Sequence, residues 1–357
     1  MKKEKIDCGC GASTRDCCGG FKIEKHTPVE VIGAVETKIG DIPVVSSKLT
    51  FKDTLGSWRM RWGIGRYGYS IEPGIYAVGN PDRNSSVFVT ANYKMSFDRL
   101  RKELAGIDCF ILALDTKGIN VWCAAGKGTF GTEELIKRIK TVELGKIVKH
   151  RRIILPQLGA PGVAAHVVTK KTGFGIVYGP VRAKDIPLFM RNGMKADEKM
   201  RRVEFPFKDR IVLAPMELVG SYKILIGALL FTILVELITT GSISLQVFLN
   251  FLPYLGAVLV GAVFVPALLP WLPGSSFAFK GWTAGVIFAA IMGNVFYPGT
   301  GTYLTWIFIL PAISAFVALN FTGCSTYTSL SGVLKEMRYA IPTIILLTLA
   351  GIIIRLL

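Results

Sequence analysis

The two halves of the chain differ in how their hydrophobic residues are spaced. Up to residue 221, short apolar runs alternate with segments in which apolar residues recur every three or four positions. Short apolar runs are typical of buried strands, and the recurrence is typical of amphipathic helices. From Tyr222 onward, apolar residues fill long, nearly uninterrupted runs. The pattern predicts an α/β domain followed by an all-α transmembrane domain.

Strands and helices are expected to alternate through most of the first half. The predicted strands cover 29–35, 43–51, 87–91, 107–115, 152–155 and 175–178. The predicted helices cover 96–104, 133–143, 162–171 and 185–192, the first capped by Ser96 and the second by Thr132. Such alternation favours a parallel sheet covered on both faces. The aromatic–basic segments 58–62 and 66–69 are typical of half-buried edge strands.

The second half contains five apolar segments, each near the ~20 residues that a membrane span requires. They are Tyr222–Thr240, Leu245–Leu269, Ala278–Tyr297, Thr302–Phe321 and Tyr339–Leu357. Small residues every four positions, Gly281, Gly285, Ala289 and Gly293, predict close approach of a neighbouring helix to the third span. Glu236 is the acid within a span, and we expect it near the outer end, where it reaches water.

Charge supports this division and sets an orientation. The chain carries a formal net charge of +17, yet residues 223–357 hold only five basic and two acidic residues. Loops near 241–244 and 298–301 lack Lys and Arg, whereas the intervening loops carry Lys280, Lys335 and Arg338. The positive-inside rule therefore places the amino-terminal half in the cytoplasm, below the inner membrane. Residues 1–20 also lack the apolar segment of a secretory signal.

The basic excess does not indicate nucleic acid, since no nucleic-acid-binding module is recognisable. Much of it precedes the first span, so an anionic lipid bilayer is the simpler partner. The residues in question are Arg191, Lys195, Lys199, Arg201, Arg202, Lys208 and Arg210. The predicted plan is a Cys-rich tail at 1–25, an α/β domain at 26–195, a basic juxtamembrane linker at 196–221 and the transmembrane domain at 222–357.

The strongest candidate for chemistry is Cys123, which follows a predicted strand and precedes three glycines. Asn120 can cap a short helix that holds Cys123 in its first turn, where backbone amides favour the thiolate that ligates metals. Open α/β sheets bind ligands at the carboxyl ends of their strands. A buried structural cysteine remains an equally good interpretation of these residues taken alone.

The run Asn120-Val121-Trp122-Cys123-Ala124-Ala125-Gly126-Lys127 resembles the signature of mercury-methylating corrinoid proteins of the HgcA type. The wider segment 73–180 resembles the corrinoid domain of the corrinoid iron–sulfur protein large subunit. The resemblance implies a Rossmann-like corrinoid-binding domain with a cobalt-containing, cobalamin-type corrinoid as cofactor. It also offers another role for segments 58–62 and 66–69, which could line the corrin or a partner's folate face.

The same resemblance implies which residues contact the corrinoid. They lie in three segments that leave strand ends at one edge: Thr90, Asn92, Tyr93, Asn120, Val121, Trp122, Cys123, Ala124, Gly126, Lys127, Gly159 and Ala160. Small residues would allow close approach of a broad disc, and Asn and Thr would bind its amide arms. None of His26, His150 and His166 lies in the Asp-x-His-x-x-Gly motif of methionine-synthase-like domains, which leaves Cys123 as the axial ligand of cobalt. We expect His166 to be a partly buried helix residue.

The implied activity is a methyltransferase that moves a methyl group from a methyl-Co(III) corrinoid to Hg(II), forming methylmercury. A thiolate is a soft, strongly donating ligand, so it would favour release of the methyl group as the carbanion equivalent that Hg(II) needs. The implied partners are a methyl-folate-linked methyl donor and an HgcB-type ferredoxin with two 4Fe–4S clusters. Cys8, Cys10, Cys17 and Cys18 could hold Hg(II), or they could be incidental to function.

Two other functions fit the same residues. The first is a corrinoid methyl carrier of acetyl-CoA and one-carbon metabolism; the five spans and the lack of a recognisable cluster motif count against it. The second is a non-enzymatic membrane thiol protein that binds soft metals and needs no corrin.

Overall fold

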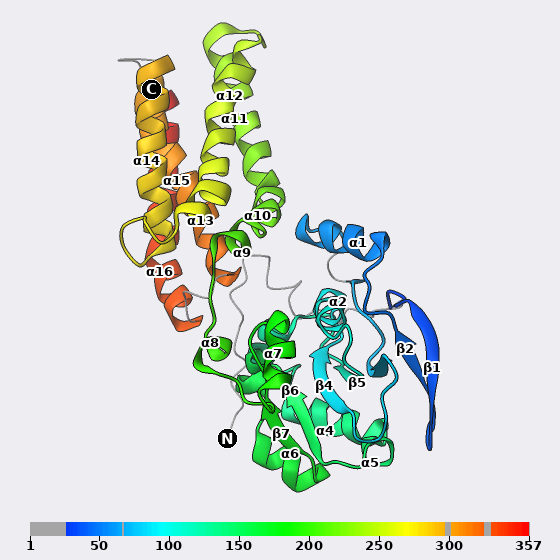
Figure 1. Ribbon diagram of the computed structural model, residues 1–357. Helices are drawn as coiled ribbons and strands as arrows, with labels where there is room; N and C mark the ends of the chain where they lie inside the picture. The colour runs from blue at the N-terminus through cyan, green and yellow to red at the C-terminus, as the bar shows by residue number, and fades with distance from the viewer. Residues whose placement is uncertain (1–25, 66–67, 297–300, 325–329, 357) are drawn as a thin grey trace, which may run out of the picture. The chain divides into compact units, whose positions relative to one another are not determined.

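We analysed a computed structural model of the chain, which describes residues 26–65, 68–296, 301–324 and 330–356 (Figure 1). The four tail cysteines lie outside these residues. Contacts within the chain separate an α/β unit, Phe21–Met60 and Ile64–Val203, from a membrane unit that contains Glu204–Leu357 and to which Arg61–Gly63 are also assigned. We describe the two units separately.

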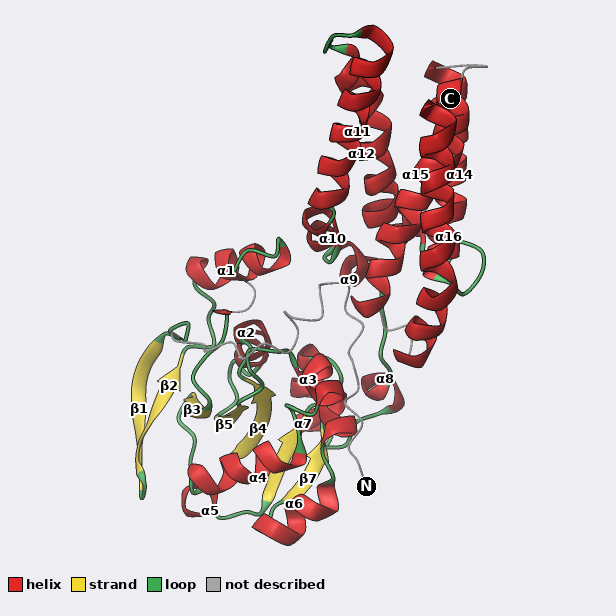
Figure 2. Ribbon diagram, turned by 180° about the vertical axis from the view of Figure 1, so that it is seen from behind, coloured by secondary structure: helices red, strands yellow, loops and turns green. Residues whose placement is uncertain are grey.

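The α/β unit is built on a seven-stranded sheet with strand order β1-β2-β3-β5-β4-β6-β7 (Figure 2). The strands are β1 (Val31–Thr37), β2 (Gly40–Val45), β3 (Gly74–Val78), β4 (Ser86–Ala91), β5 (Cys109–Leu114), β6 (Arg152–Leu155) and β7 (Gly175–Tyr178). The strands β5, β4, β6 and β7 are parallel, but β3 is antiparallel to β5 and β1 to β2. The four strands that alternate with helices, β4 to β7, are parallel as predicted, but the antiparallel β3 and the β1–β2 hairpin make the whole sheet mixed. The short β3–β4 connection is one reason, because parallel strands need a crossover of a dozen or more residues.

Helices cover both faces of this sheet, as predicted. They are α2 (Lys94–Glu103), α3 (Val121–Lys127), α4 (Thr132–Thr141), α5 (Leu144–Ile147), α6 (Ala165–Thr172), α7 (Ile186–Arg191) and α8 (Glu198–Arg201), with 3₁₀ turns η2 (Gln157–Gly162) and η3 (Ala183–Asp185). The strand β5 is buried along its whole length, and its residues alternate between two cores. Phe110, Leu112 and Leu114 face one core, while Cys109, Ile111 and Ala113 face the other.

The helix α1 (Phe51–Arg61) lies where the sequence predicted the end of one strand and most of another. The strand expected at 43–51 ends at Val45, and segment 58–62 is helical rather than an edge strand. A capping box explains the difference: the Thr50 backbone N–H donates to Asp53 Oδ2 over 2.9 Å, and the Asp53 N–H donates to Thr50 Oγ1 over 3.2 Å. This local signal outweighed the alternation of aromatic and basic residues.

Asp53 also connects α1 to α2 through a buried ion-pair cluster. Lys94 Nζ lies 2.5 Å from Asp53 Oδ1 and 2.7 Å from Asp98 Oδ2, while Arg101 Nη2 lies 2.7 Å from Asp53 Oδ2. Burial acts to raise the pKa of Asp53, but the hydrogen bonds from Lys94 and Thr50 outweigh it and hold the pKa far below its usual value. Lys94 is the first residue of α2, which begins two residues before the predicted Ser96 and has Tyr93 as its N-cap residue.

The capping prediction for Thr132 was also wrong. Gly131 occupies the N-cap position of α4. The Thr132 hydroxyl instead accepts a hydrogen bond of 2.8 Å from the Ala164 backbone N–H. It therefore ties α4 to the segment that enters α6.

The membrane unit confirms the prediction of five apolar helices long enough to cross a bilayer, among the described residues. Its elements are α9 (Phe207–Ile211), α10 (Ala214–Gly220), α11 (Tyr222–Thr240), α12 (Gln246–Leu259), the π-helical turn η4 (Val260–Phe264), α13 (Val265–Leu268), α14 (Phe277–Phe296), α15 (Gly301–Asn320), η5 (Phe321–Cys324) and α16 (Leu330–Leu356). The helices α12, η4 and α13 together form the second span, Gln246–Leu268.

The glycines of α14 allow the close helix approach that their spacing predicted. A Cβ at Gly281 would meet the Ser314 carbonyl oxygen at 2.6 Å, and one at Gly285 would meet the Pro311 Cα at 2.6 Å. Backbone of α15 therefore lies directly against α14. Any larger side chain at these positions would push the two helices apart.

Two charged residues of the membrane unit differ from expectation. Glu236 is buried and accepts a 2.7 Å hydrogen bond from the Ser244 hydroxyl, so it does not simply reach water. Arg210, which we counted among the lipid-facing basic residues, is also buried and donates to the carbonyl oxygens of Phe205 and Ala267. Both side chains therefore have hydrogen-bond partners within the protein.

Candidate functional site

Three loops converge at one edge of the parallel part of the sheet. Ala91 at the end of β4 is paired with Leu114 at the end of β5, and Phe88 of β4 pairs with Ile154 of β6. The chain leaves β4 toward α2, which packs into one core, and leaves β6 toward α6, which packs into the other. Adjacent strands whose connections leave toward opposite faces open a crevice that binds ligands in this class of sheet.

Cys123 stands at this edge in the first turn of α3. Asn120 is the N-cap residue, and its side-chain oxygen accepts a 2.9 Å hydrogen bond from the Cys123 backbone N–H. The cysteine is half-buried and free, whereas Val121 and Ala124 on the same helix are buried. The predicted cap and the predicted place of Cys123 are therefore those found in the structure.

Asn92 organises the loop that leads to Cys123. It is completely buried, and its side-chain oxygen accepts hydrogen bonds from the backbone N–H groups of Thr116 and Gly118 and from the Thr116 hydroxyl, over 2.9–3.1 Å. Its amide nitrogen donates to the Ile71 carbonyl oxygen over 3.2 Å. Asn92 thus lies beneath the site and holds its loop, and Thr90, also buried, lies beside it on β4.

Thr116 is a site residue that the sequence analysis missed. Its hydroxyl donates to the Ile119 carbonyl oxygen over 2.6 Å and also contacts Asn92 Oδ1, so it bridges two turns of the loop. The residues between these turns, Lys117 and Gly118, both have positive φ, 58° and 67°. A turn signal existed in the Asp115-Thr116-Lys117-Gly118 run, but the burial of Thr116 depends on the distant Asn92.

The turn η2 packs against α3 and brings Gly159 and Ala160 to the same site. A Cβ at Gly162 would meet the Phe130 carbonyl oxygen at 2.2 Å, and one at Gly159 would meet the Phe130 ring at 2.4 Å. Phe130 is fully buried. Gly159 is therefore small because it must admit Phe130, a reason that the sequence did not reveal.

The outer surface of this assembly is open and combines exposed glycines, Gly126 and Gly128, with larger side chains. Gly126 and Lys127 are exposed, and a Cβ added at Gly126 would meet nothing within 4 Å. Trp122 is 41% exposed. Tyr93 is half-buried and meets Tyr69 edge-on, with ring centroids 6.5 Å apart. The half-buried Cys123 therefore lies close to an open surface on which Gly126 leaves room for a bound group.

Charged side chains bind the outer side of the loop that leads from β5 to α3. The Asp115 backbone N–H donates to Glu134 Oε1 over 2.9 Å, and Lys117 Nζ lies 2.5 Å from Asp115 Oδ2. Burial acts to raise the pKa of Asp115, but hydrogen bonds from Lys117 outweigh it, so the pKa lies below its usual value. These contacts fix the loop from its outer side.

Cys123 is unlike Cys109, the other cysteine of this unit. Cys109 is fully buried in β5, and burial, aided by the charge of Asp108, raises the pKa of its thiol to about 12. Among the described residues, no group of three or more His, Cys, Asp or Glu side chains could hold a metal ion. His166, expected to be partly buried, is exposed. Cys123 is therefore not part of such a cluster among the described residues.

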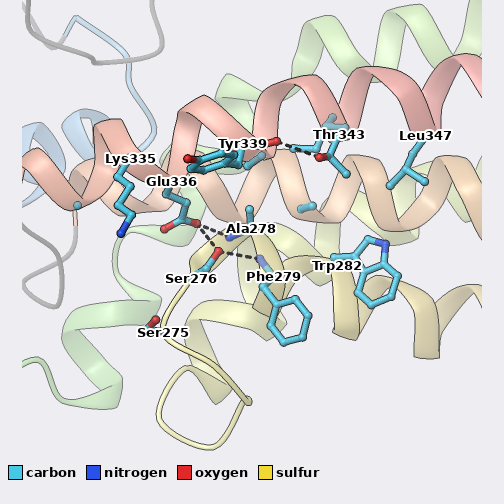
Figure 3. Close-up of a pocket in the computed structure, with 14 residues that line it drawn as sticks. Ser275, Ser276, Ala278, Phe279, Trp282, Lys335, Glu336, Tyr339, Thr343 and Leu347 are labelled. Carbon is cyan, nitrogen blue, oxygen red and sulfur yellow. Dashed lines mark hydrogen bonds between the residues drawn. The ribbon is translucent and has the colours of Figure 1, made fainter.

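The membrane unit holds a separate cavity of about 780 Å³ between α14 and α16 (Figure 3). Glu336 accepts hydrogen bonds at its rim from the Ser276 hydroxyl, over 2.9 Å, and from the Ala278 N–H, over 2.7 Å. Phe279, Trp282 and Leu347 line its apolar part. Glu336 thereby caps the start of α14, and the apolar lining suits lipid chains better than chemistry.

Part of the chain is similar to known proteins. Residues 42–190 match the family described as CO dehydrogenase/acetyl-CoA synthase delta subunit. The acetyl-CoA decarbonylase/synthase complex subunit gamma of Methanopyrus kandleri is 31% identical over 122 residues, which are 34% of this chain and 26% of the relative. The corrinoid/iron-sulfur protein large subunit of Moorella thermoacetica is 32% identical over 123 residues, 34% of this chain and 27% of the relative.

The chain thus spans about a quarter of the length of these curated relatives. The matches name two different subunits, delta and gamma, so they agree on the type of complex rather than on one subunit. The family match lies in the α/β unit, where Cys123 and its loops are found. The chain is therefore similar, over part of its length, to subunits of the acetyl-CoA synthase type and to the large subunit of a corrinoid/iron–sulfur protein, as the resemblance of segment 73–180 predicted.

Proposed function

We propose that this chain is a membrane-anchored corrinoid protein that accepts a methyl group and passes it on. The observation that carries the proposal is the half-buried, free Cys123 close to an open surface, in a chain that is similar over part of its length to a corrinoid protein. When bound, the corrinoid would supply a cobalt centre that carries the methyl group. Cys123 would hold the cobalt from one side, because its sulfur is a soft ligand.

The other residues would bind and orient the cofactor. Gly126, Ala160 and the backbone of α3 would allow the disc to approach closely, while Trp122, Lys127 and Tyr93 offer contacts at its edge. Asn92, Thr116 and Asn120 would act through the loop, by fixing the position of the Cys123 backbone. Because the loop is held by buried hydrogen bonds, the sulfur would need little rearrangement on binding.

The methyl acceptor has two candidates. The relatives are subunits of acetyl-CoA synthase complexes, which favours a methyl carrier of one-carbon metabolism. The Asn120–Lys127 motif and its cysteine favour Hg(II) as acceptor, since thiolate donation would promote transfer of a carbanion-like methyl group. In that case a methyl-folate-linked donor and a ferredoxin-like protein with two 4Fe–4S clusters would be its partners.

One experiment tests both corrinoid binding and the identity of the methyl acceptor. The full chain is purified without oxygen in the presence of a corrinoid, its visible spectrum is recorded, and the methylated form is offered Hg(II) or an acetyl-CoA synthase with CO and CoA. We expect a corrinoid spectrum in the wild type that changes in the Cys123→Ala variant and not in Cys109→Ala. Methylmercury or acetyl-CoA then identifies the acceptor, while a protein that takes up no corrinoid contradicts the proposal.

A further inference from the structure

The helix α1 rests on the α/β unit by one of its faces. Asp53 and Met60 are buried, and Asp53 is held by the ion pairs to Lys94 and Arg101. Between them, a Cβ at Gly56 would meet the Tyr69 hydroxyl oxygen at 2.4 Å, so the glycine allows close contact. The helix is therefore fixed to the unit with a defined face turned away from it.

That outward face is a continuous apolar stripe. Phe51, Leu55 and Trp58 on the helix, and Trp62 directly after it, are 80%, 47%, 60% and 37% exposed. Their spacing of four, three and four residues keeps them on one side of the helix. Large aromatic side chains exposed in a row mark a surface that binds something apolar.

Basic side chains border this stripe. Lys52 and Arg59 are both exposed, and each lies about 100° around the helix from an aromatic neighbour, Phe51 or Trp58. The acid of the helix, Asp53, is on the buried face and paired. An apolar face rich in tryptophan with a basic border is typical of helices that lie in the interface of a membrane with anionic lipids.

We propose that α1 is an interfacial membrane helix, which inserts Phe51, Leu55, Trp58 and Trp62 between the headgroups of anionic phospholipids. A bilayer is the expected binding partner of this stripe, because five described helices of the same chain are long and apolar enough to cross a membrane. Because the membrane-spanning helices tether α1 to the bilayer, its effective concentration at the lipid surface is high. A short apolar stripe is then enough for binding. The proposal does not depend on the cofactor or on the methyl acceptor.

The test uses the full chain in nanodiscs of phosphatidylcholine and phosphatidylglycerol that contain a lipid with a doxyl quencher near the headgroup. Subtracting the fluorescence of Trp58→Phe from that of the wild type isolates the emission of Trp58, and Trp122→Phe gives a matched difference for another exposed tryptophan. We expect roughly half or more of the Trp58 emission to be quenched, as for an interfacial indole, and the Trp122 emission to be unaffected. Circular dichroism checks that both variants are folded.

The basic border has its own control. Reversing Lys52 and Arg59 to Glu should reduce the quenching of Trp58, whereas reversing Lys137 and Lys140 on α4 should not. Replacing phosphatidylglycerol with phosphatidylcholine should also reduce it. If Trp58 emits at the wavelength of a water-exposed indole and is not quenched, the proposal is wrong. Blue-shifted Trp58 emission that the doxyl lipid does not quench also overturns the proposal, because a protein surface would then cover the stripe. Equal quenching of Trp58 and Trp122 overturns it as well, because it would show only that the whole α/β unit lies near the lipid.

Discussion

Cys109 and Cys123 lie fourteen positions apart, at the two ends of the segment that runs through β5 into α3, yet their surroundings are opposite. Cys109 is fully buried between strands and helices, and burial raises the pKa of its thiol to about 12. Cys123 is half-buried at the end of the sheet, with its backbone N–H bound to Asn120. The same side chain is thus a packing group in the strand and an available ligand in the loop. The two thiols differ in exposure because one lies inside the sheet and the other at its edge.

The largest expected effect is the loss of Cys123. Cys123→Ala should reduce methyl transfer below detection while leaving the unfolding transition nearly unchanged, because a half-buried thiol contributes little packing. Methyl transfer is followed with a corrinoid-loaded protein and the acceptor that the wild type uses. Cys109→Ala is the matched control and should keep most of the activity. Wild-type rates in Cys123→Ala would remove its role as ligand.

Cys123→His sharpens the same test. Imidazole can bind cobalt but donates electrons less strongly than thiolate. We expect this variant to keep a corrinoid spectrum and to fail in transfer to Hg(II). If it transfers the methyl group as well as the wild type, the soft-ligand argument for mercury is wrong.

Thiol labelling should separate the two cysteines directly. With a pKa of about 12, Cys109 is thiolate in only about one molecule in ten thousand at pH 8, and it is also inaccessible. Iodoacetamide at pH 8 should therefore modify Cys123 in the folded protein and leave Cys109 unmodified. Mass spectrometry distinguishes them, since trypsin places them in the peptides 103–117 and 118–127. Equal labelling would mean that β5 opens readily.

Removal of Asn92 should disturb the Cys123 loop more than any exposed asparagine. Asn92→Ala leaves the N–H groups of Thr116 and Gly118 without their acceptor, and each buried unsatisfied group costs ~1–3 kcal/mol. We expect the free energy of unfolding to fall by about 3 kcal/mol in a chemical denaturation of the α/β unit. Asn84→Ala, in an exposed turn, should change it by less than about 0.5 kcal/mol.

The smallest effect should be that of Cys109→Ala on stability. Loss of one buried sulfur should lower the free energy of unfolding by ~1–2 kcal/mol near neutral pH. The wild type should also lose stability as pH rises from about 9 toward 12, because the unfolded thiol releases its proton in this range and the folded thiol retains it. The variant should lack this part of the alkaline loss. An identical pH profile in both proteins would show that Cys109 is not shielded.

Local sequence determined much of the site because its signals act over a few residues. The Asn120 cap and the place of Cys123 at a strand end depend on a short segment, and they were predicted. The five apolar spans follow from length and composition, and the close α14–α15 contact follows from the spacing of Gly281 and Gly285. The corrinoid resemblance also came from one uninterrupted motif and its surroundings.

Only the tertiary structure decided the features that join distant residues. Nothing near Asn92 indicates that it accepts three hydrogen bonds from a loop more than twenty residues away. The burial of Glu236 depends on Ser244 folding back, and the antiparallel β3 depends on which strand lies beside β5. The exposed stripe of α1 likewise appears only once the opposite face is fixed by Lys94 and Arg101. Periodicity reports which residues share a face, but the partner of that face is set by packing across the whole chain.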